Sequence, residues 1–156
     1  MKNRIGYGQV EPNHLSAQRN GQIYAQLACE VELQNGMFAK YDMASNEVNL
    51  DGEGEWMLVY SEVKVYDTLN ESAKDFVIKA GSYPRLFATH VGDIFTTNMT
   101  SDWDSVTYAG GEYLSVAADG MLKKADSKPA SGMVWKVVKV YTMPDGQDGI
   151  KIQRIQ

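Results

Sequence analysis

The fold class follows from one stretch late in the chain, Met133-Val-Trp-Lys-Val-Val-Lys-Val-Tyr141. β-Branched and aromatic residues dominate it, as is typical of a strand. The turn-forming run Pro144-Asp-Gly-Gln-Asp-Gly149 follows, and Ile150-Lys-Ile-Gln-Arg-Ile155 then alternates apolar and polar side chains. Two such runs with turn residues between them predict an antiparallel hairpin that buries one face.

Similar patterns recur earlier in the chain. Ile23 to Leu33 carries apolar side chains at odd positions, and Asn35-Gly36 is typical of a type I′ hairpin turn that leads into a partner strand at residues 37–41. Leu86 to Thr97 is predicted as a strand interrupted at Gly92-Asp93, and Asp119-Gly120 predicts another hairpin.

Roughly nine short strands with regularly spaced turns predict an all-β, mainly antiparallel fold, either a compact β-barrel or a sandwich. The chain has one helix candidate, residues 70–79. Asn70 is a suitable N-cap there, but Phe76-Val-Ile78 favours a strand, so the helix and strand interpretations are balanced.

The first 21 residues differ from the rest because they are polar, with isolated apolar side chains that fit neither a helical nor a strand period. We interpret residues 1–21 as an extended N-terminal arm and residues 22–156 as a single β domain. Such arms fray unless something holds them in place.

Composition narrows the function classes. The 156 residues carry a net charge of −5, and the basic residues are scattered, so we expect no nucleic-acid partner. No stretch approaches the 18 or so apolar residues of a membrane span, and the first residues lack the apolar core of a signal peptide. Cys29 is the only cysteine, and its place in an apolar alternation favours a small buried side chain.

The residues that carry most catalytic and metal chemistry are sparse. His14, His90 and Cys29 have no metal-ligand spacing, and no nucleophile or phosphate-loop motif occurs. Asp93 is the most interesting acid, but beside Gly92 it is better explained as a carboxylate that bonds the local backbone at a bend. We therefore expect no enzyme activity, no metal and no cofactor.

Two acidic clusters, Asp51/Glu53/Glu55 and Asp145/Asp148, do not have the spacing of a calcium loop and favour solvated turns. Trp103, in a loop between Asp102 and Asp104, is the best candidate for an exposed aromatic that contacts a ligand or an interface. Exposed tryptophans along a groove, with Trp56 or Trp135 beside it, would indicate a carbohydrate- or small-ligand-binding module.

Three segments resemble small structural proteins of tailed bacteriophages, particularly head decoration proteins. They are Leu15-Ser-Ala-Gln-Arg-Asn-Gly-Gln-Ile-Tyr-Ala-Gln-Leu27, Pro84-Arg-Leu-Phe-Ala-Thr-His-Val-Gly-Asp-Ile-Phe-Thr-Thr-Asn98 and Val140-Tyr-Thr-Met-Pro-Asp-Gly-Gln-Asp-Gly-Ile-Lys-Ile-Gln153. The resemblance implies a β-rich body on the outside of an icosahedral shell, often a trimer, that clamps neighbouring major capsid proteins. It also implies an arm that orders on docking.

The expected function is therefore that of a non-enzymatic virion protein, made in the host cytoplasm, that binds the capsid surface and stabilises it. The expected partners are the major capsid protein and further copies of the chain. The arm residues expected to contact a partner are Tyr7, Asn13, His14, Leu15, Gln18 and Arg19. A head–tail connector or tail protein, and a ligand-binding β module, remain the alternatives.

Overall fold

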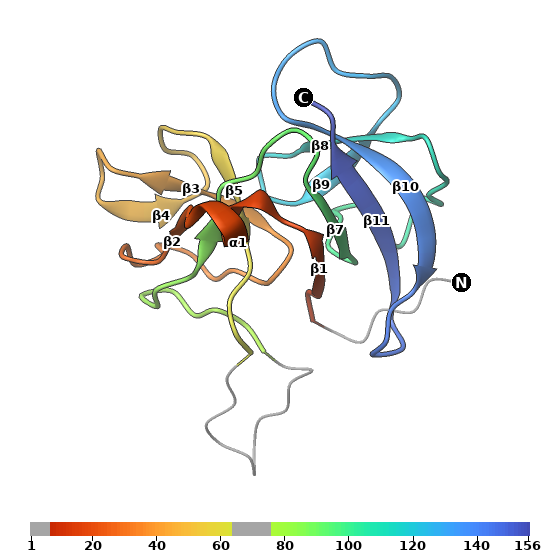
Figure 1. Ribbon diagram of the computed structural model, residues 1–156. Coiled ribbons are helices and arrows are strands. Elements are labelled where there is room, and N and C mark those ends of the chain that lie inside the picture. The colour runs from red at the N-terminus through yellow and green to blue at the C-terminus, as the bar shows by residue number, and fades with distance from the viewer. Residues whose placement is uncertain (1–6, 64–75) are drawn as a thin grey trace.

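The protein consists of two antiparallel sheets of short strands (Figure 1), as a computed structural model describes it for residues 7–63 and 76–156. The six-stranded sheet has the order β1 (Val10–His14), β7 (Ile94–Thr97), β11 (Asp148–Arg154), β10 (Val134–Thr142), β8 (Tyr113–Val116) and β9 (Leu122–Ala125). The five-stranded sheet has the order β2 (Ile23–Tyr24), β6 (Leu86–Phe87), β5 (Trp56–Val59), β3 (Phe38–Asp42) and β4 (Glu47–Asn49).

The predicted all-β, antiparallel class is confirmed. In the described residues neither sheet closes into a barrel, and the arrangement is compatible with a sandwich of short strands. The one helix of this part of the chain is α1 (Ser16–Asn20), a single short turn between β1 and β2.

The predicted hairpin of β10 and β11 is also confirmed, and it is the longest strand pair among the described residues. Val137 lies opposite Ile152, and Val140 lies opposite Ile150. The register shifts between Val137 and Lys139, which inserts Val138 as a bulge. The bulge keeps the paired apolar residues of both strands on one face, although the alternation along β10 is broken.

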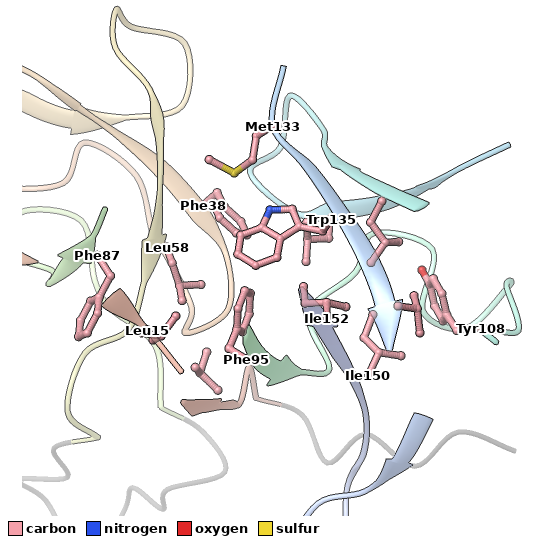
Figure 2. Packing of buried hydrophobic residues seen from close by; sticks show 14 of the residues in the cluster. Leu15, Phe38, Leu58, Phe87, Phe95, Tyr108, Met133, Trp135, Ile150 and Ile152 are labelled. Atoms are coloured by element: carbon pink, nitrogen blue, oxygen red, sulfur yellow. The ribbon is translucent and has the colours of Figure 1, made fainter. Parts of the chain in front are cut away.

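The main core lies between the two sheets and is built on aromatic rings (Figure 2). Trp135 from β10 lies edge-on to Phe95 from β7, with ring centroids 5.0 Å apart, and 5.8 Å from Phe38 of β3. All three side chains are fully buried. Tilted and edge-on aromatic pairs each add about 0.5–1.5 kcal/mol beyond the burial of area, so this cluster joins the sheets.

A second core covers the other face of the five-stranded sheet. Leu27, Cys29 and Leu33 are buried there, as the alternation of residues 23–33 predicts. The segment is nevertheless not one long strand: after β2 it forms only isolated bridges, between Cys29 and Val48 and between Leu33 and Ile78. The alternation identified the buried face correctly but overestimated the strand pairing.

The bridge at Ile78 bears on the balanced interpretation of residues 70–79. Ile78 exchanges two backbone hydrogen bonds with Leu33, of 2.8 and 2.9 Å. Residues 76–79 are therefore outside any helix and extended at Ile78, and residues 70–75 lie outside the described part of the chain.

The predicted hairpin at Asn35-Gly36 is wrong. The following strand, β3, pairs with β4 and β5 and not with the preceding segment. A type I′ turn needs positive φ at both central residues, but only Gly36 has it here. Asn35 is buried and its side chain bonds both the N–H and the C=O of Ser61, so the dipeptide forms an interior corner.

Residues 7–21, the described part of the predicted arm, are not extended and free. β1 pairs with β7 and becomes the edge of the six-stranded sheet. Leu15 and Ala17 are buried in the main core, and α1 ends at Gly21, whose N–H donates to Ala17 O with a left-handed φ of 67°. The segment is thus built into the body that was predicted to start at residue 22.

Replacing Gly36 by Ala tests the interior corner, with Gly111→Ala as the matched control. Both glycines have positive φ, 94° and 95°, so Ala costs about 1–2 kcal/mol at either one. A Cβ at Gly36 would lie 2.5 Å from Thr97 Oγ1, whereas one at Gly111 meets nothing within 4 Å. We expect Gly36→Ala to lose about 1–3 kcal/mol more of the free energy of urea unfolding than the control. Equal losses would contradict the corner.

Candidate functional site

The N-terminal segment is held to the body at two polar sites, and the first lies at its start. Tyr7 donates its hydroxyl to Asp145 Oδ2 at 2.7 Å, and its backbone C=O accepts from Asn98 Nδ2 at 2.9 Å. Asn98 also accepts from the N–H of Gln9 at 2.8 Å and donates to Gln147 Oε1 at 2.9 Å. Gln147 Nε2 closes the network on Asp145 at 2.8 Å.

The two amide side chains at the centre of this network are buried, since Asn98 and Gln147 are both fully inaccessible to solvent. Burial, reinforced by the hydrogen bond to Asp145, raises the pKa of Tyr7. Burial alone would raise the pKa of Asp145 as well, but hydrogen bonds from Gln147 and Tyr7 outweigh it and lower that pKa. The folded state therefore stabilises the charged form of Asp145.

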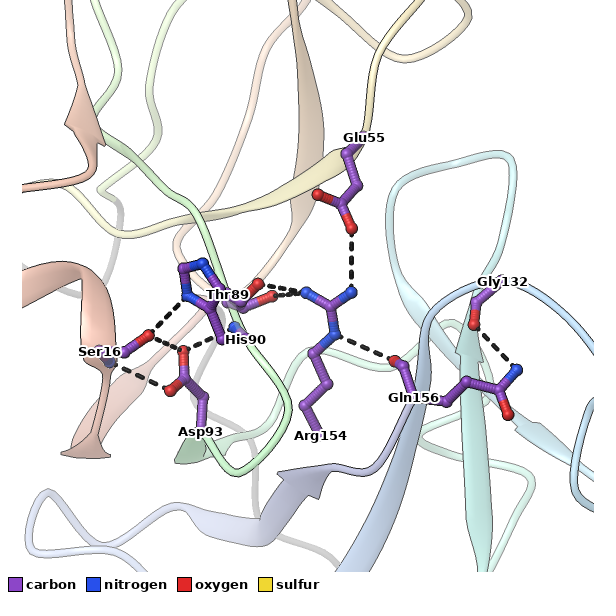
Figure 3. Close-up of polar contacts among 8 residues, drawn as sticks. All are labelled: Ser16, Glu55, Thr89, His90, Asp93, Gly132, Arg154 and Gln156. Carbon is purple, nitrogen blue, oxygen red and sulfur yellow. Dashed lines mark hydrogen bonds and ion pairs between the residues drawn. The ribbon is translucent and has the colours of Figure 1, made fainter. Parts of the chain in front are cut away.

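The second site brings together Ser16, His90 and Asp93 (Figure 3). The carboxylate of Asp93 is 2% exposed and accepts three hydrogen bonds. They come from Ser16 N at 3.1 Å, Ser16 Oγ at 2.9 Å and the backbone N–H of His90 at 3.0 Å. Asp93 thus bonds the local backbone, as predicted, and also fixes the first residue of α1.

Gly92 makes the bend before Asp93 possible. Its φ is 101°, in the left-handed region that favours glycine. The bend is tied to β11, because Gly92 N donates to Arg154 O at 2.8 Å and Arg154 N donates to Asp93 O at 2.9 Å. The interruption that the sequence shows in this strand is therefore the corner that places Asp93 under α1.

The three side chains are those of a hydrolytic triad, but their order differs. In such triads the imidazole lies between the hydroxyl and the carboxylate. Here Ser16 Oγ lies between the two, 2.8 Å from His90 Nδ1 and 2.9 Å from Asp93 Oδ2. A hydroxyl has one proton, and Ser16 Oγ donates it to the carboxylate of Asp93, so its lone pairs remain available to a protonated His90 Nδ1. Together the three residues attach the start of α1 to the body, and we call Ser16, His90 and Asp93 the latch.

Arg154 lies beside this latch and connects the two sheets (Figure 3). Its guanidinium donates to the backbone C=O of Thr89, to Thr89 Oγ1 at 3.0 Å and to Glu55 Oε1 at 2.9 Å. Nε donates to the C=O of Gln156 at 3.0 Å. The fork geometry of arginine suits this set of acceptors, which come from both halves of the molecule and the end of the chain.

The six arm residues expected to contact a partner fall into three groups by the exposure of their side chains. Four have exposed side chains: Asn13, His14, Gln18 and Arg19. Tyr7 is half-buried in the first polar site. Leu15 is only 3% exposed and packs in the main core, so its expected role as a partner contact is corrected: it anchors the segment from the inside.

The expectation that Trp103 is an exposed aromatic side chain is also wrong. It is 2% exposed and packs against Tyr108, with ring centroids 6.2 Å apart. The hydroxyl of Tyr108 donates to Asp102, which ties the loop down over the indole. The acidic neighbours predicted an exposed loop, but the loop is short enough to fold its tryptophan into the core.

The other two tryptophans do not form an aromatic surface either. Trp135 is fully buried, and Trp56 is half-buried with Lys40 Nζ 4.8 Å from its ring centroid. A shallow depression beside Ser101, Ser105, Ala118 and Lys123 has no aromatic side chain in its lining. Neither the three tryptophans nor this depression therefore offers the exposed aromatic surface that the ligand-binding alternative required.

Two of the sheet edges offer little to an added strand. Pro12 interrupts the outer edge of β1, and proline is tolerated mainly where an edge needs no donor. The edge of β4 is covered by residues 28–30, since Val48 N donates to Ala28 O and Glu30 N to Val48 O. The backbone at these two edges is therefore poorly placed to pair with an added strand.

Within residues 7–63 and 76–156, no group of three or more His, Cys, Asp or Glu side chains could hold a metal ion. The described helix, α1, is far too short to cross a membrane. Comparison with protein-family models, with curated proteins and with solved structures found no match.

Sequence reasoning missed Ser16, Asn98, Gln147 and Arg154. Asn98 and Gln147 lie 49 residues apart, and an isolated amide carries no pattern that predicts its partner. Ser16 gave a weak signal, because serine favours the first positions of a helix, but five residues of helix are too few to show a period.

Tyr7→Phe tests the first polar site. We expect it to lower the free energy of unfolding by about 1–2 kcal/mol at pH 7, because Asp145 loses a donor. The lowered pKa of Asp145 means that its contribution is present above its unfolded value near 3.9 and is lost as the pH falls through the folded value. The raised pKa of Tyr7 means that its contribution is complete below about 10 and is lost as the pH rises through the folded value.

The stability difference between the wild type and Tyr7→Phe should therefore be largest between about pH 5 and pH 9 and shrink on both sides. Denaturant unfolding at a series of pH values measures it. Tyr83→Phe is the control, because Tyr83 is 66% exposed. A difference that stays constant from acid to alkali would count against the Tyr7–Asp145 bond.

Asp93→Ala tests the latch. It leaves three donors of Ser16 and His90 without their acceptor, which should cost about 2–3 kcal/mol of the free energy of unfolding. Because α1 loses its attachment, limited proteolysis should cut residues 7–20 earlier than in the wild type. The exposed Asp126→Ala serves as the control. An unchanged cleavage rate would show that Asp93 does not hold the segment.

Proposed function

We propose that this chain is a virion structural protein that binds the outer surface of a bacteriophage capsid, bridges its major capsid protein subunits and stabilises the shell. It is made in the host cytoplasm and ends up on the virion. One observation carries the proposal. The three segments that resemble head decoration proteins are far apart in the sequence but form one contiguous part of the molecule.

The contacts between those segments are direct. Ile23 of the first segment pairs with Phe87 of the second, and Ser16 bonds Asp93. Thr97 of the second segment pairs with Ile150 of the third. A resemblance produced by chance composition would have no reason to gather in one place, so this clustering supports a shared structural element.

The exposed side chains of the N-terminal segment support a docking role. His14, Gln18 and Arg19 are exposed on β1 and α1, which are fixed by the two polar sites and by Leu15, whereas the exposed Asn13 also accepts a hydrogen bond from Thr96 Oγ1 at 2.8 Å. Side chains on a preformed segment lose less conformational entropy on binding than those of a free arm. The resemblance implied an arm that orders on assembly. For residues 7–21 we propose instead a binding surface that is already formed before assembly.

Arg19→Glu tests the proposal, with Lys128→Glu as a control of equal charge change on an exposed loop. Purified protein is mixed with undecorated shells of the same phage, and bound protein and shell melting are measured. We expect the wild type and the control to bind and to raise the melting temperature of the shell. Arg19→Glu should bind roughly tenfold more weakly or worse, because it reverses the charge of an exposed side chain on the proposed docking surface.

Failure of the wild-type protein to bind shells, with no change in shell stability, would overturn the proposal. Binding confined to a single vertex in a reconstruction would replace it by a connector role. Equal binding by Arg19→Glu and the wild type would move the docking surface away from α1.

A further inference from the structure

Charge is divided between the two halves of the molecule. Residues 22–63, which form four strands of the five-stranded sheet and its covering segment, contain eight carboxylates and one lysine. Residues 120–156, which include β9, β10 and β11, contain seven Lys or Arg and three Asp. Figure 1 shows β3 and β4 at one end of the molecule and β10 and β11 at the other. The net charge of −5 conceals this separation.

The basic end has a defined surface, the outer face of β10 and β11. Lys139 lies directly opposite Lys151, and Lys136 lies next along this face, opposite Gln153. Like charges directly opposite each other on a sheet are destabilising. Among the described residues none of these ammonium groups has a carboxylate within salt-bridge distance. We call Lys136, Lys139 and Lys151 the lysine face.

Two tyrosine rings lie next to the ammonium groups of the lysine face. Tyr141 lies between two of the lysines, with its ring centroid 4.9 Å from Lys139 Nζ and 5.6 Å from Lys151 Nζ. Its hydroxyl donates to Glu11 of the edge strand β1 at 2.5 Å, which engages that carboxylate. Lys136 Nζ lies 5.9 Å from the ring of Tyr113. A tyrosine ring thus lies within cation–π distance of each of the three ammonium groups, and Lys136 and Lys139 are exposed to solvent.

Apolar area accompanies the charge. Val138, at the bulge directly before Lys139, is 48% exposed. A surface with half-buried tyrosine rings, a partly exposed valine and lysines that lack carboxylate partners has the mixture of apolar area and charged surroundings that protein interfaces use. The arrangement is costly in the monomer and becomes favourable against an acidic surface.

The acidic end of the same chain supplies such a surface. Glu30, Glu47, Asp51 and Glu53 are exposed around β4, and the backbone hydrogen bond from Glu30 N to Val48 O, next to Glu47, brings the first two together. Glu55 is partly neutralised by Arg154, so it is left out of this set. We call Glu30, Glu47, Asp51 and Glu53 the acidic end.

We infer that copies of this chain associate head to tail, with the lysine face of one copy against the acidic end of the next. Because the two surfaces differ and lie at opposite ends, the contact is heterologous and repeats from copy to copy, closing into a ring when the rotation allows it. This gives surfaces to the self-association expected of a decoration protein. It concerns the purified chain alone and does not require capsid binding.

Sedimentation of the purified full chain tests the inference over a range of protein and salt concentrations. We expect species larger than a monomer at low salt and their dissociation at about 0.5 M NaCl, where the Debye length falls to roughly 4 Å. Lys136→Glu/Lys139→Glu should weaken association at least about tenfold. Lys79→Glu/Lys128→Glu, with the same change in net charge at exposed positions outside the lysine face, should associate like the wild type.

A charge swap identifies the pairing of surfaces. Glu47→Lys/Glu53→Lys should also be a monomer alone, but a mixture of it with Lys136→Glu/Lys139→Glu should associate again. Thermal unfolding of each variant confirms that it is folded. The lysine-face variant should unfold at the wild-type temperature or above, because a glutamate in place of Lys139 relieves the repulsion on Lys151.

Four results would overturn the inference. A wild-type chain that stays monomeric at low salt removes the self-association, whether or not shells bind it. Association that survives in the lysine-face variant, or a mixture that fails to associate, assigns the contact to other surfaces. A monomer that retards a DNA fragment at low salt would assign the lysine face to nucleic acid instead.

Discussion

The contact of Trp135 with Phe38 and Phe95 is the constraint on which the rest of the structure depends. These three rings come from β10, β3 and β7, so one cluster involves both sheets. Apart from β10 and β11, the described strands are short, and short hairpins are marginal when they stand alone. Packing across the sheets therefore decides where each strand lies. The polar contacts of Arg154, Asp93 and Asn98 then fill the border of that packed region.

The same hairpin that supplies Trp135 also creates the basic surface. The bulge after Val137 returns Val140 to the position opposite Ile150 and leaves Lys139 opposite Lys151 on the outer side. One extra residue thus satisfies two demands, matched apolar pairs on one face and a concentrated charge on the other. Lysines could be spread over the sheet at less electrostatic cost, and their pairing here is a local violation of the rule that like charges avoid facing positions.

Sequence reasoning succeeded where a pattern is local and failed where pairing is not. The β10–β11 hairpin has both strands and its turn within about twenty residues, and it was predicted correctly. Asn35-Gly36 has the residues of a local turn, yet Asn35 bonds Ser61, 26 residues away, so the tertiary contact overrides the local preference. At residues 27–33 the alternation predicted which side chains are buried, because burial needs a face, but not which strand pairs with the segment.

The candidate site shows the same limit more sharply. Polarity made residues 1–21 look like an arm, but in residues 7–21 much of that polarity is satisfied inside the molecule. The backbone of Tyr7 and Gln9 bonds Asn98, and Ser16 bonds Asp93. Polar residues indicate a free segment only when water is their partner, and a sequence does not show whether a distant carboxylate or amide replaces it. Leu15 shows the difference most clearly. It is buried in the core, with polar contacts before and after it in the sequence, and it fixes the segment whose first part pairs with β7 as an edge strand. The ordering entropy that a free arm would lose only on binding is thus already lost on folding for residues 7–21.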